Sequence, residues 1–151
     1  PDGIPFETGC TYTRNQILIA MDRLCTWREG VKYFKNRKAD VFLITINKSE
    51  SDFTSSTRYE DYAINDREFH SQTRSTSETA DRYFHHEERG SRVFLFVRER
   101  RTDPETKSAM SYTCLGEAVY VSHQGSAPIN IVWRLKTPLS SHLLQICQAS
   151  R

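Results

Sequence analysis

The sequence of 151 residues contains few cysteines and no long apolar run. Its four cysteines, at positions 10, 25, 114 and 147, are widely scattered, and no two have the CxxC spacing of zinc and redox sites. This excludes a small secreted disulfide scaffold, so we expect reduced thiols and a cytoplasmic protein. No apolar segment approaches the roughly 20 residues of a membrane-spanning helix, and the N-terminal residues lack the features of a signal peptide. We therefore expect a soluble protein with no membrane partner.

Motifs for catalysis and metal binding are also lacking. The sequence has no nucleophile elbow, no Ser-His-Asp pattern and no phosphate-binding glycine loop. His85 and His86 precede two glutamates, but their spacing does not fit the HExxH metal motif and no cysteine is near them. His123, close to Gly125, fits a turn between strands better than a catalytic base. We expect no catalytic residue, no metal and no cofactor, and hence a domain that is not itself an enzyme.

The net charge is small, with 21 basic and 19 acidic residues and a formal charge of +2. This value allows an anionic partner without indicating one. Basic residues cluster in two places, where contacts with phosphates and a solvated surface explain them about equally well. The clusters are Lys32, Lys35, Arg37 and Lys38, then Arg98, Arg100, Arg101 and Lys107.

The chain has the length of one domain that can bury a sizeable core. Pro1, Gly3 and Pro5 suggest a linker, so we expect a boundary segment over residues 1–11 and a single domain over residues 12–151. This start also predicts that the chain is part of a longer protein.

Apolar periodicity predicts one early helix followed by strands. Thr13 and Gln16 fit a capping box that precedes an amphipathic helix over residues 14–25. Strands are predicted over residues 31–34, 39–47, 92–99, 112–122 and 129–135, and a closing helix over residues 139–147. The polar residues 71–79 are expected to be mobile. This order favours an α+β fold built on a curved, mostly antiparallel sheet or small barrel.

A polar block over residues 47–77 carries the residue types of a recognition site. Its aromatic rings could stack on a planar heterocycle such as a nucleobase, while Asp61 accepts from an exocyclic amine. A packing pair of Tyr59 and Tyr62 beside a solvated Asp61 explains the composition equally well. Trp27 is either a further pocket wall or a core residue, and Trp133 is expected in the core.

Several stretches together match a family pattern: TYTRNQIL, WREGV, FLITINKSE, RYEDYAIND, EFHSQT, RYFHHEERG, VFLFVRE and YTCLGEAVYVSHQGSAPINIVWRL. They resemble the C-terminal domain, long of unknown function, of bacterial superfamily 2 helicases, from about residue 12 to residue 135. Some of these helicases also carry a phospholipase-D-type nuclease and act as modification-dependent (type IV) restriction enzymes. The resemblance implies an SRA- or PUA-like curved β-barrel with an N-terminal amphipathic helix. It also implies a non-catalytic DNA-binding module that flips 5-methylcytosine or 5-hydroxymethylcytosine into an aromatic pocket. The implied partners are double-stranded DNA with modified cytosine and the helicase and nuclease domains of the same polypeptide.

The resemblance, with the residue types, assigns two sets of positions. The base pocket would comprise Trp27, Asn47, Tyr59, Asp61, Tyr62, Phe69 and Gln72. Contacts to the DNA backbone would come from Lys48, Arg58, His70, Arg74 and His85. The family often has an aromatic residue directly after the Phe-His pair, where this sequence has Ser71, so one pocket wall differs.

Selectivity for one methyl group is expected to be modest, because burying it is worth only about 1 kcal/mol. Two other functions fit the sequence. The domain could be a helicase-associated interaction and coupling module without base specificity. It could also read modified RNA, in which case it would prefer single strands.

Overall fold

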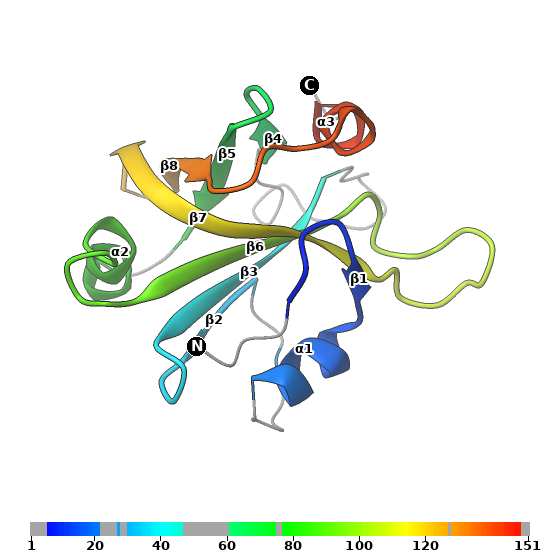
Figure 1. The fold of residues 1–151 in the computed structure, drawn as a ribbon, viewed down its shortest axis with the longest axis horizontal. Coiled ribbons are helices and arrows are strands. Elements are labelled where there is room, and N and C mark those ends of the chain that lie inside the picture. The colour runs from blue at the N-terminus through cyan, green and yellow to red at the C-terminus, as the bar shows by residue number, and fades with distance from the viewer. Residues whose placement is uncertain are drawn as a thin grey trace.

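The computed structural model describes residues 6–21, 27, 30–46, 61–74, 77–126 and 128–148, which form an α+β fold (Figure 1). Three helices accompany one eight-stranded sheet. The strands are β1 (Thr11–Tyr12), β2 (Val31–Phe34), β3 (Ala39–Thr45), β4 (Tyr62–Ala63), β5 (Glu68–Thr73), β6 (Arg92–Arg98), β7 (Tyr112–Gln124) and β8 (Ile129–Leu135). The helices are α1 (Arg14–Ala20), α2 (Ser77–Phe84) and α3 (Ser141–Gln148). No helix in the described part of the chain is both long and apolar enough to cross a membrane.

The sheet is open and mostly antiparallel, with the order β2-β3-β6-β7-β8-β5-β4 and β1 added against β7. Only β3 and β6 pair in parallel among the described strands. The predicted α+β class and antiparallel character are therefore confirmed. A closed barrel is not formed by the described strands, because β2 and β4 lie at opposite ends of the order.

Strand β7 bends the sheet, and Figure 1 shows it as a long curved arrow across the molecule. Its pairing shifts register twice, opposite Leu95 and Phe96 of β6 and again between Tyr120 and Ser122. Such bulges insert an unpaired residue and increase the local bend. Gly116 lies at the first shift with φ of 91°, and a Cβ there would stand 2.7 Å from Thr8 Oγ1. The positive φ thus favours glycine, and a larger residue would also have to displace the Thr8 side chain.

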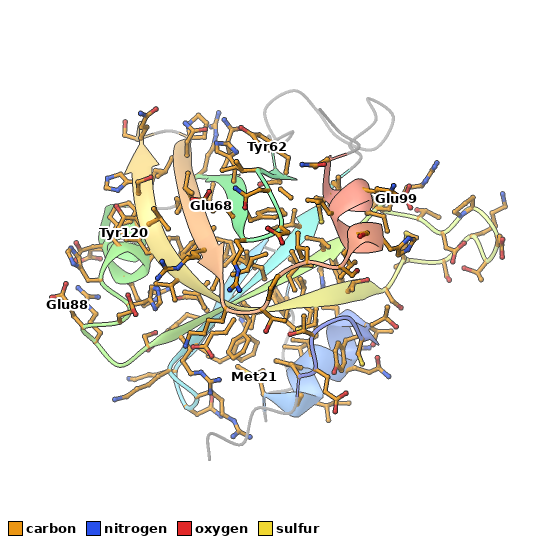
Figure 2. The ribbon with its side chains drawn as sticks, turned by 45° about the horizontal axis from the view of Figure 1, so that its top comes forward. Met21, Tyr62, Glu68, Glu88, Glu99 and Tyr120 are labelled. Atoms are coloured by element: carbon orange, nitrogen blue, oxygen red, sulfur yellow. The ribbon has the colours of Figure 1, made fainter. Side chains whose placement is uncertain are left out.

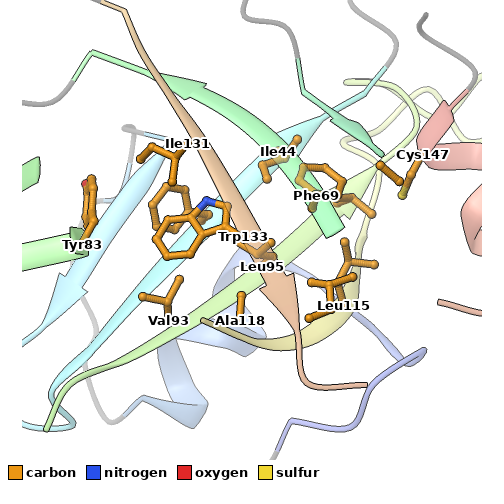
Figure 3. Packing of buried hydrophobic residues seen from close by; sticks show 14 of the residues in the cluster. Ile44, Phe69, Tyr83, Val93, Leu95, Leu115, Ala118, Ile131, Trp133 and Cys147 are labelled. Atoms are coloured by element: carbon orange, nitrogen blue, oxygen red, sulfur yellow. The ribbon is translucent and has the colours of Figure 1, made fainter. Parts of the chain in front are cut away.

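One hydrophobic core lies between the curved sheet and helices α2 and α3. Trp133 is at its centre and is fully buried (Figure 3). Its ring packs edge-on against Phe42 at 5.4 Å between ring centroids, and Phe42 in turn contacts Tyr83 of α2 at 5.1 Å. The C-terminal helix adds Cys147, which is also fully buried. These rings connect β3, β8 and α2 into one packed unit.

A second core covers the opposite face of strands β3 and β6. Ile17, Leu18 and Met21 of the α1 region are buried there. Along β6 the predicted alternation is confirmed: Val93, Leu95 and Val97 belong to the first core, and Phe94 and Phe96 to the second. Strand β6 is therefore buried on both sides, as its nearly continuous apolar sequence requires.

Helix α1 begins with the predicted capping box. The Gln16 N–H donates to Thr13 Oγ1 at 3.1 Å, and the Thr13 N–H donates to Gln16 Oε1 at 2.8 Å. The helix ends at Ala20, and residues 22–25 of the predicted longer helix lie outside the described residues.

Strand β5 and helix α2 lie in a polar part of the chain for which the sequence predicted no strand or helix. The expected mobile segment 71–79 contains the end of β5 and the start of α2. The polar sequence concealed the strand because the inward positions of β5 after Phe69 are Ser71 and Thr73, which carry no apolar signal. Only Ala80 and Tyr83 of α2 are buried, so the helix showed only a narrow apolar stripe.

An ion pair fixes α2 to the sheet. Arg82 donates two hydrogen bonds, at 2.7 and 2.9 Å, to the carboxylate of Asp40, which is fully buried on β3. The guanidinium also lies 4.1 Å from the ring centroid of Tyr33. Burial raises the pKa of Asp40 despite the opposing effect of Arg82, and the hydrogen bond to Asp40 raises the pKa of Arg82. The carboxylate thus depends on this one guanidinium for most of its compensation.

His86 forms a second connection, from the turn after α2 to β7. Its Nδ1 lies 3.1 Å from the Ser91 carbonyl oxygen, and its Nε2 lies 3.1 Å from the Tyr120 amide nitrogen. A carbonyl only accepts and an amide only donates, so the ring proton is on Nδ1. The imidazole is 2% exposed and has a structural role in this conformation.

Candidate ligand-binding face on strands β4, β5, β8 and β7

The outward side of strands β4, β5, β8 and β7 gathers most of the described polar residues that the sequence singled out. Burial alternates along β5 and β8, which places every second side chain on this outward side. On β5 the outward residues are Glu68, His70 and Gln72. On β8 they are Asn130, Val132 and Arg134. Figure 2 shows Tyr62 and Glu68 together on this side, while Met21 lies at the other end of the molecule.

Strand register arranges these side chains in rows across the sheet. Residues that are direct partners in an antiparallel pair share a face, and neighbouring strands lie about 4.8 Å apart. The first row contains Gln72, Asn130 and Gln124. The second row contains Tyr62, His70, Val132 and Ser122. In a third row Glu68 lies opposite Arg134.

A stacked ring pair stands at the β4 end of the second row. The rings of Tyr62 and His70 are 4.6 Å apart between centroids and inclined by 18°. Both side chains are half-buried. Their strands pair antiparallel with Tyr62 directly opposite His70, and this register places the two rings in contact.

Asp61 directly precedes Tyr62 of this ring pair and contacts the backbone of β5. Its Oδ1 accepts the backbone N–H of Gln72 at 3.1 Å, so the side chain continues the ladder beyond the two-residue strand β4. Asp61 is 6% exposed. Asp61 is therefore a nearly buried carboxylate that a backbone N–H holds in place at the start of β4.

The first row is a chain of amide hydrogen bonds. Gln72 Nε2 donates to Asn130 Oδ1 at 2.7 Å, and Asn130 Nδ2 donates to the backbone carbonyl of Gln124 at 3.4 Å. Since Gln72 also meets Asp61 through its backbone, the row is continuous with the ring pair and the carboxylate.

The structure brings together four of the residues proposed from the sequence, namely Asp61, Tyr62, His70 and Gln72. Arg74 is exposed directly after the end of β5. Four others, Asn47, Lys48, Arg58 and Tyr59, lie outside the described residues.

Phe69 and Trp27 occupy the cores in this conformation. Phe69 points inward from β5 and is fully buried in the first core. Trp27 is 3% exposed in the second core, with its ring 5.6 Å from that of Phe34. Neither ring lies on the outward face. Of the two roles that the sequence allowed for Trp27, pocket wall or core residue, the structure shows the core residue.

Ser71, which stands where the family often has an aromatic residue, also faces the core. Its hydroxyl accepts the indole N–H of Trp133 at 3.0 Å, and its side chain is almost completely buried. This position therefore does not line the outward face, and its side chain instead satisfies the buried indole.

His85 lies apart from the face, just after α2, between two carboxylates. Its Nε2 is 3.3 Å from Asp81 and its Nδ1 is 3.2 Å from Glu88. This acidic setting is unfavourable for a phosphate. No group of three or more metal-binding side chains occurs among the described residues.

Sequence reasoning missed Asn130, Arg134 and Ser122 as members of the face. The sequence identifies them only as parts of two strands, and only the pairing of β8 between β5 and β7 places them beside Gln72 and His70. The alternation of polar residues along β8 was the one signal in the sequence, and it predicts an exposed side without saying what lies next to it.

A family model described as a domain of unknown function, DUF3427, matches residues 6–146. The chain belongs to the DUF3427 family. No curated protein matches the chain. The matched region of this DUF3427 domain includes all the described strands, so the outward face with its ring pair and amide row, and Asp61 beside Tyr62 in the chain, lie entirely within it.

Proposed function

We propose that this DUF3427 domain is a non-catalytic DNA-binding module that reads a modified cytosine, 5-methylcytosine or 5-hydroxymethylcytosine, with its outward face. The observation that carries the proposal is the meeting of Asp61, Tyr62, His70 and Gln72, which span positions 61–72, in one continuous group. These side chains supply aromatic surface, a fixed acceptor and amide donors, which together suit a flipped base.

Stacking would supply most of the affinity for the base. An aromatic side chain contributes about 1–3 kcal/mol for each stacked base. Tyr62 and His70 already hold each other parallel, so little side-chain freedom is lost when a base joins them. A methyl group on the base adds only about 1 kcal/mol, so the selectivity must also come from the shape of the site.

Asp61 would contact the edge of the base. A carboxylate accepts from the N4 amine of cytosine. The Asp61 carboxylate is already fixed by the hydrogen bond that it accepts from the Gln72 backbone N–H. Residues 47–60 join the end of β3 to Asp61 by chain connectivity and carry Tyr59, Lys48 and Arg58. We propose that they complete the base pocket and its phosphate contacts.

The wider setting follows from the family resemblance. We propose that the domain acts as the target-recognition part of a modification-dependent restriction system, with helicase and nuclease domains in the same polypeptide. Its fold would be a variant of the SRA and PUA-like architecture. A bent, mostly antiparallel sheet with helices packed against it supports this relationship.

The test is a titration of the domain with fluorescent duplexes that differ at one cytosine, which is unmodified, 5-methylated or 5-hydroxymethylated, at two salt concentrations. We expect tighter binding of one modified duplex, with a background that weakens as salt rises. Asp61→Asn should abolish the preference while leaving the background, because the amide keeps an acceptor for the Gln72 N–H but loses the charge. Asp66→Asn, on the exposed turn between β4 and β5, is the matched control and should bind like the wild type.

Equal binding of all three duplexes by the wild-type domain would refute the proposal. The domain would then be better described as a coupling module for the helicase. A preference for single-stranded RNA over every duplex would instead identify a reader of modified RNA.

A further inference from the structure

The amide row Gln72, Asn130 and Gln124 lies at one rim of the sheet. Gln72 is next to the last residue of β5, Asn130 is next to the first residue of β8, and Gln124 ends β7. Each is a direct cross-strand partner of its neighbour, so the three amides follow one line across three strands. Neither end of this line enters a core, because Gln72 and Asn130 are half-buried and Gln124 is exposed.

The hydrogen bonds of Asn130 leave its side-chain amide able to bind a further group. A side-chain amide has two N–H donors and an oxygen with two acceptor positions. In the described part of the chain, Asn130 uses one donor on the Gln124 carbonyl and one acceptor position on Gln72. The same amide thus retains a donor beside an acceptor. Its orientation is held by the two bonds it already makes.

This pairing of donor and acceptor matches one base edge in particular. Adenine presents N7 as acceptor beside the N6 amine as donor in the major groove, and asparagine and glutamine are its usual bidentate partners. The dimensions also agree. The row spans two strand spacings, about 10 Å, which fits a major groove about 12 Å wide and covers roughly three base steps at 3.4 Å each.

We infer that Asn130 and Gln124 are specificity-determining residues that read an adenine in the base pairs next to the modified cytosine. The inference rests on the proposed function, and it adds a flanking sequence preference to the recognition of the modified base. Gln72 joins the two parts, because its backbone contacts Asp61 and its side chain contacts Asn130. Arg74, exposed one residue beyond the end of β5, is placed to meet a phosphate of the same duplex.

The experiment is a selection by the domain from duplexes that carry one modified cytosine within randomised flanking base pairs, followed by sequencing. We expect enrichment of adenine at one flanking position by about 5- to 150-fold, the range of one bidentate contact. Gln124→Ala should reduce the enrichment without changing thermal stability, since the described structure gives its side chain no hydrogen bond. Gln145→Ala, an exposed glutamine on α3, is the matched control and should retain it.

Asn130→Asp provides a change of specificity rather than a loss. The aspartate keeps an oxygen for the Gln72 N–H but replaces the amide donor by a second acceptor. A carboxylate accepts from cytosine N4, so the enriched base should change from adenine to cytosine. This outcome cannot arise from unfolding.

The possible failures are distinguishable. Wild-type domain that prefers modified duplexes but selects random flanks would overturn this inference alone. Selection by the wild-type domain of a base other than adenine would also overturn it. The same holds if Gln124→Ala and Asn130→Asp both select adenine as strongly as the wild type does. Wild-type domain that does not discriminate modified from unmodified duplexes would overturn the proposed function and this inference with it.

Discussion

Removal of Arg82 is expected to destabilise the domain strongly and in a pH-dependent way. In Arg82→Met the aliphatic part of the side chain is approximately retained while both hydrogen bonds to the fully buried Asp40 are lost. Breaking a buried pair by removing one partner costs about 3–5 kcal/mol. Unfolding entropy near 2.1 cal/mol/K per residue gives about 0.3 kcal/mol/K for this chain, so Tm should fall by about 9–16 °C at pH 7.5.

The pH dependence follows from the remaining carboxylate. Burial already raises the pKa of Asp40, and without Arg82 nothing of equal strength opposes it. A carboxyl whose pKa is higher in the folded state than in the unfolded state stabilises the fold below the unfolded pKa of about 3.9. That stability is lost as the pH rises through the folded pKa. The Tm deficit of Arg82→Met relative to wild type should therefore be smaller at pH 5 than at pH 7.5.

Thermal unfolding followed by far-ultraviolet circular dichroism at the two pH values measures this. The double variant Asp40→Asn/Arg82→Met removes the titrating carboxyl and provides the control for the histidines, which titrate in the same range. Its deficit should be nearly independent of pH and smaller than that of the single variant at pH 7.5. Equal deficits for the single variant at both pH values, or an equally pH-dependent double variant, would show that the unpaired Asp40 carboxylate is not the cause of the pH dependence.

Two further predictions concern Glu117 and the buried thiols. Burial raises the pKa of Glu117, but the hydrogen bonds from Arg92 and Lys136, at 2.9 and 3.0 Å, outweigh it and lower the pKa overall. The stabilising effect of Glu117 should thus be present above the pKa of the unfolded state and be lost as the pH falls through the pKa of the folded state. The Tm advantage of wild type over Glu117→Gln should therefore shrink between pH 6 and pH 3. A constant Tm difference would contradict this. Burial raises the pKa of Cys114 to about 11 and that of Cys147 to about 12. In a variant with the other two cysteines replaced by serine, neither thiol should react with an aromatic disulfide reagent at pH 8 until urea unfolds the domain, and rapid reaction of the native protein would show that the core is open.

The sequence predicted several strands well because their signal is local. Strands 31–34 and 129–135 have the predicted bounds, since dense apolar and β-branched residues end there in turn residues. The alternation of Val93 and Phe94 on opposite sides was also predicted, and it corresponds to two separate cores. The capping box at Thr13 is equally local, because both of its hydrogen bonds join residues three positions apart.

The candidate face could be predicted only in part because it depends on contacts between distant segments. The residue types near Asp61 and His70 indicated a recognition site, and these residues do lie together. The participation of Asn130 depends on the insertion of β8 between β5 and β7, which no short segment encodes. Strand β5 itself was missed because two of its three inward residues are polar. The polar Ser71 is accommodated in the core because its hydroxyl accepts the indole N–H of Trp133, a contact with a strand distant in the sequence.

The place of β8 in the sheet has a consequence for the order in which the domain can assemble during synthesis. Strands β2, β3, β6 and β7 are neighbours and precede β8 in the chain, so they can pair as soon as residue 124 has emerged. Strand β5 is synthesised earlier than β6, yet its described partners are only β4 and β8. Among the described strands it can therefore pair only with β4 until β8 arrives beside β7. A nascent or truncated chain that ends before Ile129 would lack β8, so the outward face is complete only after β8 has been synthesised.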